Sequence, residues 1–290
     1  MYDGVVASSL LLRSVLFVPG TSPDRFSKAF ASGADAVVLD LEDGVEATRK
    51  DEARKAVGAW LAQPASGRAE RLVRVNASDS TWIAGDLAWL ATLEGRYDAV
   101  VLPKVERPEQ LARMARAIPS RRVIPLLETA RGIVHAPAIV AADADVPAVF
   151  FGAEDLTAEL GVARTVEGEE LIVARSQVVL AAASIGAEPI DAVFVNIARL
   201  ERLRDDATRA RALGFSGKMA IHPDQVPVIN RVFSPSHEEI AAARTLVDAD
   251  DAARARGEGA FRLDDQMVDA PVVKRARRIL ERAAAARPQG

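Results

Sequence analysis

Short apolar segments alternate with longer amphipathic segments between residues 13 and 234. Eight of the short segments are apolar without the regular polar interruptions of a half-exposed strand. Continuous apolar runs are typical of parallel strands that are covered on both faces. The predicted strands are residues 14–18, 36–41, 72–75, 99–102, 123–127, 148–151, 190–195 and 218–221.

The segments between these runs have helical periodicity, at about residues 22–31, after Glu46, and at 169–185 and 201–213. Ser22 is a suitable N-cap for the first of them, with Pro23 in the first helical position. Eight strand–helix repeats in 290 residues predict a closed (β/α)8 TIM barrel. An open doubly wound sheet is the alternative. It would require a glycine fingerprint after the first strand, where Gly20 stands alone.

The C-terminal residues exceed what an eighth repeat needs. We therefore predict three parts: an N-terminal extension at 1–12, the barrel at 13–234, and a C-terminal arm at 235–290. In the arm, Ser236 and Glu239 have the spacing of a capping box at the start of a long helix. Residues 257–271 have the pattern of a small hairpin or lid, and a last helix begins near Pro271. This helical and hairpin extension is where we expect a contact with a neighbouring subunit or a cover over the active site.

Composition and charge narrow the function classes. The absence of cysteine excludes a disulfide scaffold, a thiolate metal site and a cysteine nucleophile. A formal net charge of −4 argues against a general nucleic-acid binder. No apolar run reaches transmembrane length, and residues 1–12 lack the basic start of a signal peptide. We therefore expect a cytoplasmic protein with no nucleic-acid or membrane partner.

Polar residues follow the predicted strands, where barrel enzymes carry their catalytic groups. Several carboxylates in this ring have few cations beside them, which favours a hard divalent cation. Oxygen ligands without cysteine favour Mg2+ over Zn2+. From spacing alone, Glu128 and the Glu154/Asp155 pair are the predicted ligands. The residues in the ring are Asp40, Glu42, Asp43, Arg74, Asn76, Lys104, Glu128, Glu154, Asp155, Asn196 and His222.

Each of these residues also has an interpretation without catalysis. Asp43 and Glu46 are placed where a helix dipole favours acids. Arg74 is suited to a structural ion pair, and Lys104 to a solvated loop. His222, followed by proline, is typical of the end of a strand.

A series of motifs extends over most of the chain. They are LFVPG at 16–20, VLDLEDGV at 38–45, VRVN at 73–76, LPK at 102–104, LETA at 127–130, FGAEDL at 151–156, GFSGKMAIHP at 214–223, and GAF at 259–261 with MVD at 267–269. Together they resemble the citrate lyase β-subunit-like proteins of the HpcH/HpaI aldolase superfamily, which also contains malyl-CoA and citramalyl-CoA lyases. One motif would be weak evidence, but eight in order indicate the family.

The resemblance implies a set of site residues. Glu128 and Asp155 would bind Mg2+, and Arg74 would bind the substrate carboxylate as a planar fork. Asp269 would be the catalytic acid/base, supplied by the arm of a neighbouring subunit, so a homotrimer or a multiple of trimers is expected. Phe17, Pro19, Gly20 and Lys28 would line the thioester and CoA side, the backbone of Met219 and Ala220 would border the substrate, and Asp40, Glu42, Asp43 and Lys104 would support the ligands and Arg74.

The implied activity is that of a magnesium-dependent carbon–carbon lyase or synthase. Its substrate would be a 3-hydroxyacyl thioester of malyl-CoA or citramalyl-CoA type, giving a 2-oxo acid and acetyl-CoA or a similar thioester. The partners would be small molecules, an acyl-CoA and a 2-oxo acid. Alternatives are a citrate lyase β subunit acting on a citryl thioester of an acyl carrier protein, a CoA thioesterase, and a non-catalytic paralogue.

Some positions depart from the pattern of the family. The stretch at 42–44 has no histidine, unlike the aldolases that act on free pyruvate, and this favours thioester substrates. Asn196 and Arg199 stand where relatives often have aspartate, which affects the expected acyl or CoA preference. Asp265 stands where a glycine is usual, in a turn that we expect aspartate to tolerate.

Overall fold

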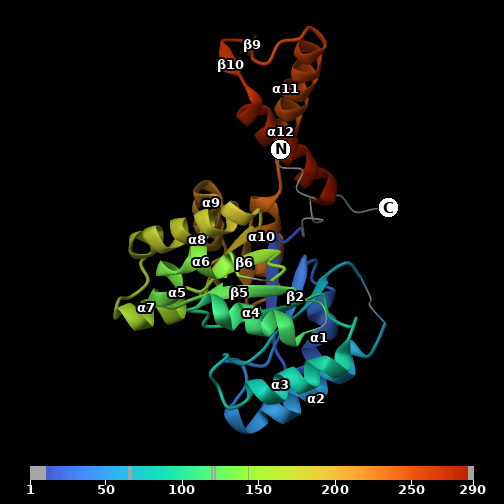
Figure 1. The fold of residues 1–290 in the computed structure, drawn as a ribbon, viewed down its shortest axis with the longest axis vertical. Helices are drawn as coiled ribbons and strands as arrows, with labels where there is room; N and C mark the ends of the chain where they lie inside the picture. The colour runs from blue at the N-terminus through green and yellow to red at the C-terminus, as the bar shows by residue number, and fades with distance from the viewer. Residues whose placement is uncertain (1–10, 65–66, 119, 121, 143, 287–290) are drawn as a thin grey trace. The chain divides into compact units, whose positions relative to one another are not determined.

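The computed structural model describes residues 11–64, 67–118, 120, 122–142 and 144–286, so most of the predicted N-terminal extension lies outside the described residues. Eight parallel strands form a closed barrel in chain order, β1 to β8 (Figure 1), which confirms the predicted fold. Val15 of β1 pairs with Met219 of β8 and closes it. The strands are β1 (Ser14–Pro19), β2 (Ala36–Asp40), β3 (Glu70–Arg74), β4 (Ala99–Leu102), β5 (Val123–Leu127), β6 (Ala148–Phe151), β7 (Glu188–Asp191) and β8 (Gly217–Ala220).

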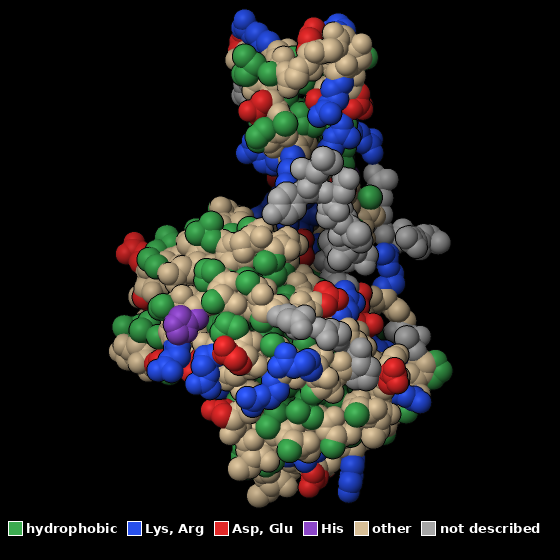
Figure 2. All heavy atoms as spheres, viewed as in Figure 1, with side chains coloured by type: hydrophobic (Ala, Val, Ile, Leu, Met, Phe, Trp, Pro, Cys, Tyr) green, Lys and Arg blue, Asp and Glu red, His purple; other side chains and the backbone are tan. Residues whose placement is uncertain are grey.

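Helices follow the strands and cover the barrel (Figure 1). Pro23 occupies the start of the first helix, as predicted, but the Ser22 side chain makes no capping hydrogen bond. Figure 2 shows apolar, acidic and basic side chains intermixed on the face in view. The helices are α1 (Pro23–Phe30), α2 (Lys50–Leu61), α3 (Ile83–Leu90), α4 (Pro108–Ala117), α5 (Ala130–Val134), α6 (Ala136–Val140), α7 (Glu154–Leu160), α8 (Ile172–Ile185), α9 (Leu200–Leu213) and α10 (Gln225–Phe233), with short 3-10 turns at Ala47–Arg49, Ala91–Leu93 and Glu169–Leu171.

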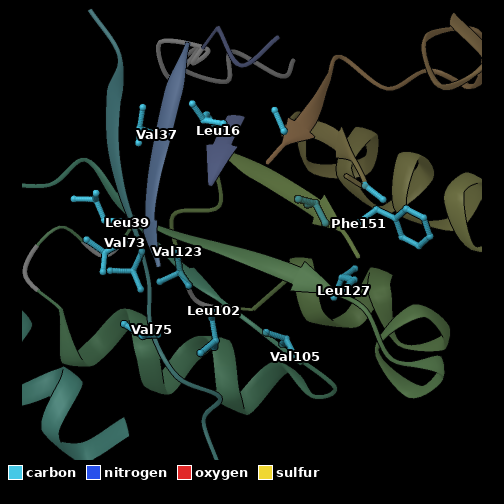
Figure 3. Packing of buried hydrophobic residues seen from close by; sticks show 14 of the residues in the cluster. Leu16, Val37, Leu39, Val73, Val75, Leu102, Val105, Val123, Leu127 and Phe151 are labelled. Atoms are coloured by element: carbon cyan, nitrogen blue, oxygen red, sulfur yellow. The ribbon is translucent and has the colours of Figure 1, made fainter. Parts of the chain in front are cut away.

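Strand alternation divides the buried side chains into two clusters. Val37 and Leu39 point outward and belong to the cluster between strands and helices, part of which is drawn in Figure 3. Val38 belongs to the smaller cluster inside the barrel. Because side chains alternate along a strand, Asp40 at the end of β2 shares the inward face of Val38. The same alternation turns Arg74 of β3 inward, so barrel closure directs both charged groups toward one mouth.

The predicted seventh strand was displaced by several residues. The apolar run 190–195 suggested its position, but β7 spans Glu188–Asp191, with Asp191 paired in register to Lys218. The strand begins at Glu188 and Pro189, which the apolar run does not include, and ends at Asp191, which is fully buried and bonded to Lys218 and Arg175. Asn196, predicted at the strand end, lies farther along and is exposed.

The chain divides into two compact units at Phe233/Ser234. The second unit contains α11 (His237–Ala255), a hairpin of β9 (Phe261–Leu263) and β10 (Gln266–Val268), and α12 (Ala270–Ala286). The predicted capping box is present, with both Ser236 and Glu239 bonds. In the hairpin turn the left-handed residue is Asp264, with φ of 51°, rather than Asp265. No helix among the described residues has the length and apolar character needed to cross a membrane.

Candidate active site

A pocket of about 360 Å3 lies at the carboxyl ends of the barrel strands. It brings together half of the residues that the sequence singled out. Those that line it are Phe17, Pro19, Asp40, Asp43, Arg74, Glu128, Glu154, Asp155 and Met219. The predicted residues therefore converge from six strands and the turns that follow them.

Arg74 and Asp40 form a bidentate ion pair between adjacent strands. Arg74 Nε and Nη2 donate to the two carboxylate oxygens of Asp40 at 2.6 and 2.7 Å. Arg74 Nη1 also lies 3.0 Å from Glu42 Oε2, and its guanidinium lies 5.2 Å from the centre of the Phe17 ring. Such a fork has its geometry fixed by several partners, as recognition of a planar anion requires.

The turn after β2 is held by bonds to its own backbone. Asp40 accepts hydrogen bonds from the N–H groups of Glu42 and Gly44 at 2.9 and 3.0 Å. A Cβ at Gly44 would come within 2.5 Å of Asp40 Oδ2, so a side chain there is excluded. Buried Lys50, stacked over Trp82, donates to the carbonyls of Leu41 and Glu42. Asp40 therefore organises both the turn and Arg74.

Lys104 connects the acids of two sides of the pocket. Its N–H donates to Glu128 Oε1 at 3.0 Å, and its Nζ donates to Glu42 Oε1 at 2.5 Å. Nζ also lies 3.2 Å from Asp43 Oδ2 and 3.6 Å from Asp155 Oδ2. Burial alone would lower the pKa of Lys104, but the Glu42 and Asp43 carboxylates raise it above its ordinary value. These contacts exclude the simple solvated-loop interpretation.

Glu128 is a buried carboxylate with little compensation for its charge. Burial is the main cause that raises its pKa to about 8, with further contributions from Asp155 and Glu42, while Arg74 acts in the opposite direction. A Cβ at Gly152 would lie 2.7 Å from Glu128 Oε2, so glycine leaves room for this carboxylate. A buried acid beside other acids is stabilised as a carboxylate when a cation binds it.

The donor set fits Mg2+. Within the described part of the chain, no three acidic or histidine side chains form a preformed metal cage. Glu128 and Asp155 are two oxygen donors in the pocket, and Mg2+ commonly uses one or two carboxylates with water or substrate in the other positions. Glu154 is ion-paired at 2.6 Å with Arg164, which distinguishes it from Asp155 at the start of α7.

Sequence reasoning missed the apolar wall of the pocket. Leu126, Val193 and Ile221 line it beside Phe17 and Met219. Leu126 and Ile221 carried a readable signal, because strand alternation places them on the same faces as Glu128 and Met219, respectively. Arg25, Gly44, Gly152 and Ala153 also line the pocket and were not singled out.

Several predicted contacts are not among the lining residues. Lys28 is exposed on α1, and Ala220 is buried in the cluster outside the barrel. Gly20 donates its N–H to the Asp40 carbonyl at 2.8 Å, where a Cβ would collide, so its role here is close backbone packing. Asp269 belongs to the second unit, is exposed, and accepts a 3.4 Å bond from the Val272 N–H in the first turn of α12. Its catalytic role stays a prediction.

Comparison with known proteins settles the family. The HpcH/HpaI aldolase/citrate lyase model matches residues 13–223. The chain belongs to this family. It is 40% identical to a citrate lyase subunit beta-like protein of Deinococcus radiodurans, covering 96% of this chain and 99% of that protein. The predicted family is thus confirmed.

Two further relatives carry more specific names. A crystal structure of Mycobacterium tuberculosis CitE in complex with magnesium, acetoacetate and coenzyme A has a TM-score of 0.78 and 40% identity, covering 93% of this chain and 97% of that one. The human mitochondrial citramalyl-CoA lyase is 33% identical, over 91% of this chain and 83% of its own length. This family member therefore resembles lyases over nearly its whole length.

Proposed function

We propose that this protein is a magnesium-dependent carbon–carbon lyase or synthase acting on a 3-hydroxyacyl thioester of malyl-CoA or citramalyl-CoA type. The observation that carries the proposal is buried Glu128, whose pKa is raised to about 8 in a pocket that also contains Asp155 and Arg74. The magnesium complex of the Mycobacterium CitE supports the same choice of metal.

Under this proposal, some of the residues bind Mg2+ or substrate, some exclude water, and one transfers a proton. Glu128 and Asp155 would hold Mg2+, which supplies charge stabilisation to substrate oxygens when bound. Arg74, fixed by Asp40 and Glu42, would orient the carboxylate of the 2-oxo acid portion. Phe17, Pro19 and Met219 would exclude water from the thioester side. Asp269 of a neighbouring subunit would exchange the proton at the thioester α-carbon.

A site completed by two chains would make assembly necessary for activity, and we propose a homotrimer or a multiple of trimers. We also expect a cytoplasmic location. Mixing Asp269→Asn protein with Arg74→Ala protein, each inactive alone, should restore part of the activity if subunits exchange. Absence of recovery in mixtures shown by mass spectrometry to contain both chains would contradict the shared site.

The direct test offers acetyl-CoA or propionyl-CoA with glyoxylate or pyruvate, with and without Mg2+. Mass spectrometry should detect a hydroxyacyl-CoA product that disappears with EDTA. Release of free CoA without carbon–carbon bond formation would favour a thioesterase. Failure with every CoA pair, despite Mg2+ binding, would contradict the CoA-ester proposal and direct the same assay to acyl-carrier-protein thioesters.

A further inference from the structure

Lys104 has an unusual backbone for its residue type. Its φ is 52°, and Asp264 in the hairpin turn is the other non-glycine residue with positive φ among the described residues. Left-handed backbone costs a long side chain on the order of 1 kcal/mol and persists where surrounding contacts enforce it. Here the contacts come from both ends of the residue, the N–H on Glu128 and the Nζ on Glu42.

The charges around Lys104 are unbalanced. The acids near it are Asp40, Glu42, Asp43, Glu128 and Asp155, and they outnumber the cations Arg74, Lys104 and Lys50. Arg74 is engaged by Asp40 and Glu42. The Lys104 ammonium contacts Asp43 and Asp155 as well as Glu42. The ammonium group therefore contacts one proposed metal ligand, Asp155, and two acids that are not proposed ligands, while the backbone N–H contacts the other proposed ligand, Glu128.

We propose that Lys104 is a positioning residue that reserves the metal site: its ammonium group occupies Glu42 and Asp43, so that a divalent cation binds through Glu128 and Asp155 and keeps coordination positions open for substrate. This inference rests on the proposed function for the identity of the ligands. A cation at Asp155 also repels the ammonium 3.6 Å from that carboxylate, so Lys104 weakens metal binding while it preserves open positions.

Removal of the ammonium should therefore tighten metal binding. Lys104→Met keeps a side chain of similar length and still requires a non-glycine residue at positive φ, but it frees Glu42 and Asp43 to bind a cation. We expect its Mg2+ and Mn2+ dissociation constants, measured by calorimetry on the substrate-free protein, to fall by about tenfold. Turnover should fall in parallel, with kcat reduced more than the KM of the thioester changes.

Three matched variants test whether the loss of the ammonium charge at Lys104 causes the tighter metal binding. Lys104→Arg keeps the charge and should keep metal affinity near that of the unmodified protein. Lys55→Met removes one lysine charge from an exposed position on α2 and should leave affinity unchanged. Adding Glu42→Gln to Lys104→Met should reverse much of the tightening, because it removes the carboxylate that the lysine had occupied.

Lys104→Gly is a second variant in case Lys104→Met does not fold. Glycine removes the ammonium and adopts positive φ without strain. It should show the same tighter Mg2+ binding. Unchanged or weaker Mg2+ binding in both Lys104→Met and Lys104→Gly would overturn the inference. Because calorimetry needs no turnover, the two proposals fail separately. Tighter Mg2+ binding in the Lys104 variants, when the unmodified protein has no lyase activity, would contradict the proposed function alone. Unchanged Mg2+ binding in the variants, when the unmodified protein is an active lyase, would contradict this inference alone.

Discussion

Two clusters of acids and cations in the same barrel have opposite character. Behind β7 and β8, Lys218 is fully buried and lies 2.5 Å from Asp191 and 2.7 Å from Asp206. Arg175 lies 2.9 and 3.1 Å from the same two acids. Two buried cations thus balance two acids. Burial alone would raise the pKa of Asp206, but Lys218 and Arg175 hold that pKa below its ordinary value.

At the pocket the same residue types are arranged without balance. Arg74 and Lys104 face a larger number of carboxylates, and Glu128 has a raised pKa because burial and neighbouring acids disfavour its charge. A closed network with equal charges stabilises a particular packing, whereas an open, acid-rich cluster is prepared for a cation that the chain does not supply. The difference distinguishes structural from functional charge without any motif.

The largest expected effect tests the functional cluster. Glu128→Gln should lower carbon–carbon bond activity by more than about 100-fold, since even residues that only support a metal ligand cause losses of that order. The same change should raise the free energy of unfolding of the metal-free protein by about 1 kcal/mol at pH 8, because it removes an uncompensated buried charge. Chemical denaturation with EDTA present measures this. A loss of stability would mean that Glu128 is structurally compensated after all.

The buried network should respond in the opposite direction. Lys218→Met leaves two buried acids with one cation and should lower the free energy of unfolding by about 3 kcal/mol. Urea denaturation of the metal-free protein is the measurement, with Lys55→Met as the exposed control. A change below about 0.5 kcal/mol would show that this network is replaceable and would remove the contrast with the pocket.

A pair of acids outside both clusters, Glu70 and Asp98, tests whether a raised pKa is sufficient to identify a functional residue. Glu70 begins β3, at the end of the strand opposite Arg74, and burial together with the Asp98 carboxylate raises its pKa to about 7. Since the folded protein then binds the proton more tightly than the unfolded chain, stability from Glu70 is present below about pH 4.5 and is lost as the pH rises through 7.

Glu70→Gln should therefore stabilise the protein by about 1 kcal/mol at pH 8, with little effect near pH 5 and no loss of activity. The effect is smaller than the full shift implies because the side chain is partly exposed to solvent. Thermal denaturation at several pH values measures the difference in stability between Glu70→Gln and the unmodified protein. A stability difference that is equal at pH 5 and pH 8 would contradict the raised pKa of Glu70.

The smallest effect concerns the other left-handed residue. Asp264→Gly should stabilise the hairpin of the second unit by about 0.5 kcal/mol, because glycine adopts positive φ without strain. Comparison of its unfolding with that of Lys104→Gly separates the cost of the backbone alone from the loss of the Lys104 contacts. Destabilisation by Asp264→Gly would show that the aspartate side chain contributes more than its backbone costs.

The sequence alone determined the barrel and the polar part of its mouth. Continuous apolar runs, their spacing and the polar residue after each run are local properties, and strand alternation converts them into inward and outward faces. Seven of the eight strands were therefore placed within about two residues of their observed bounds, as β5 (Val123–Leu127) illustrates. The same logic placed Glu128, Arg74 and the Glu154/Asp155 pair at the mouth, and the resemblance to the family then singled out Asp155.

Tertiary structure decided how the charges are shared. Lys104 meets Glu42 across 62 positions, and Lys218 meets Asp191 across 27, contacts that exist only once the strands are neighbours in a closed barrel. The misplaced bounds of β7 have a related cause: the strand begins at Glu188 and Pro189, which an apolar pattern does not mark, although both are buried in the barrel. A local apolar pattern records what each residue prefers in isolation, whereas the burial of a charge depends on partners that only folding brings within a few ångströms.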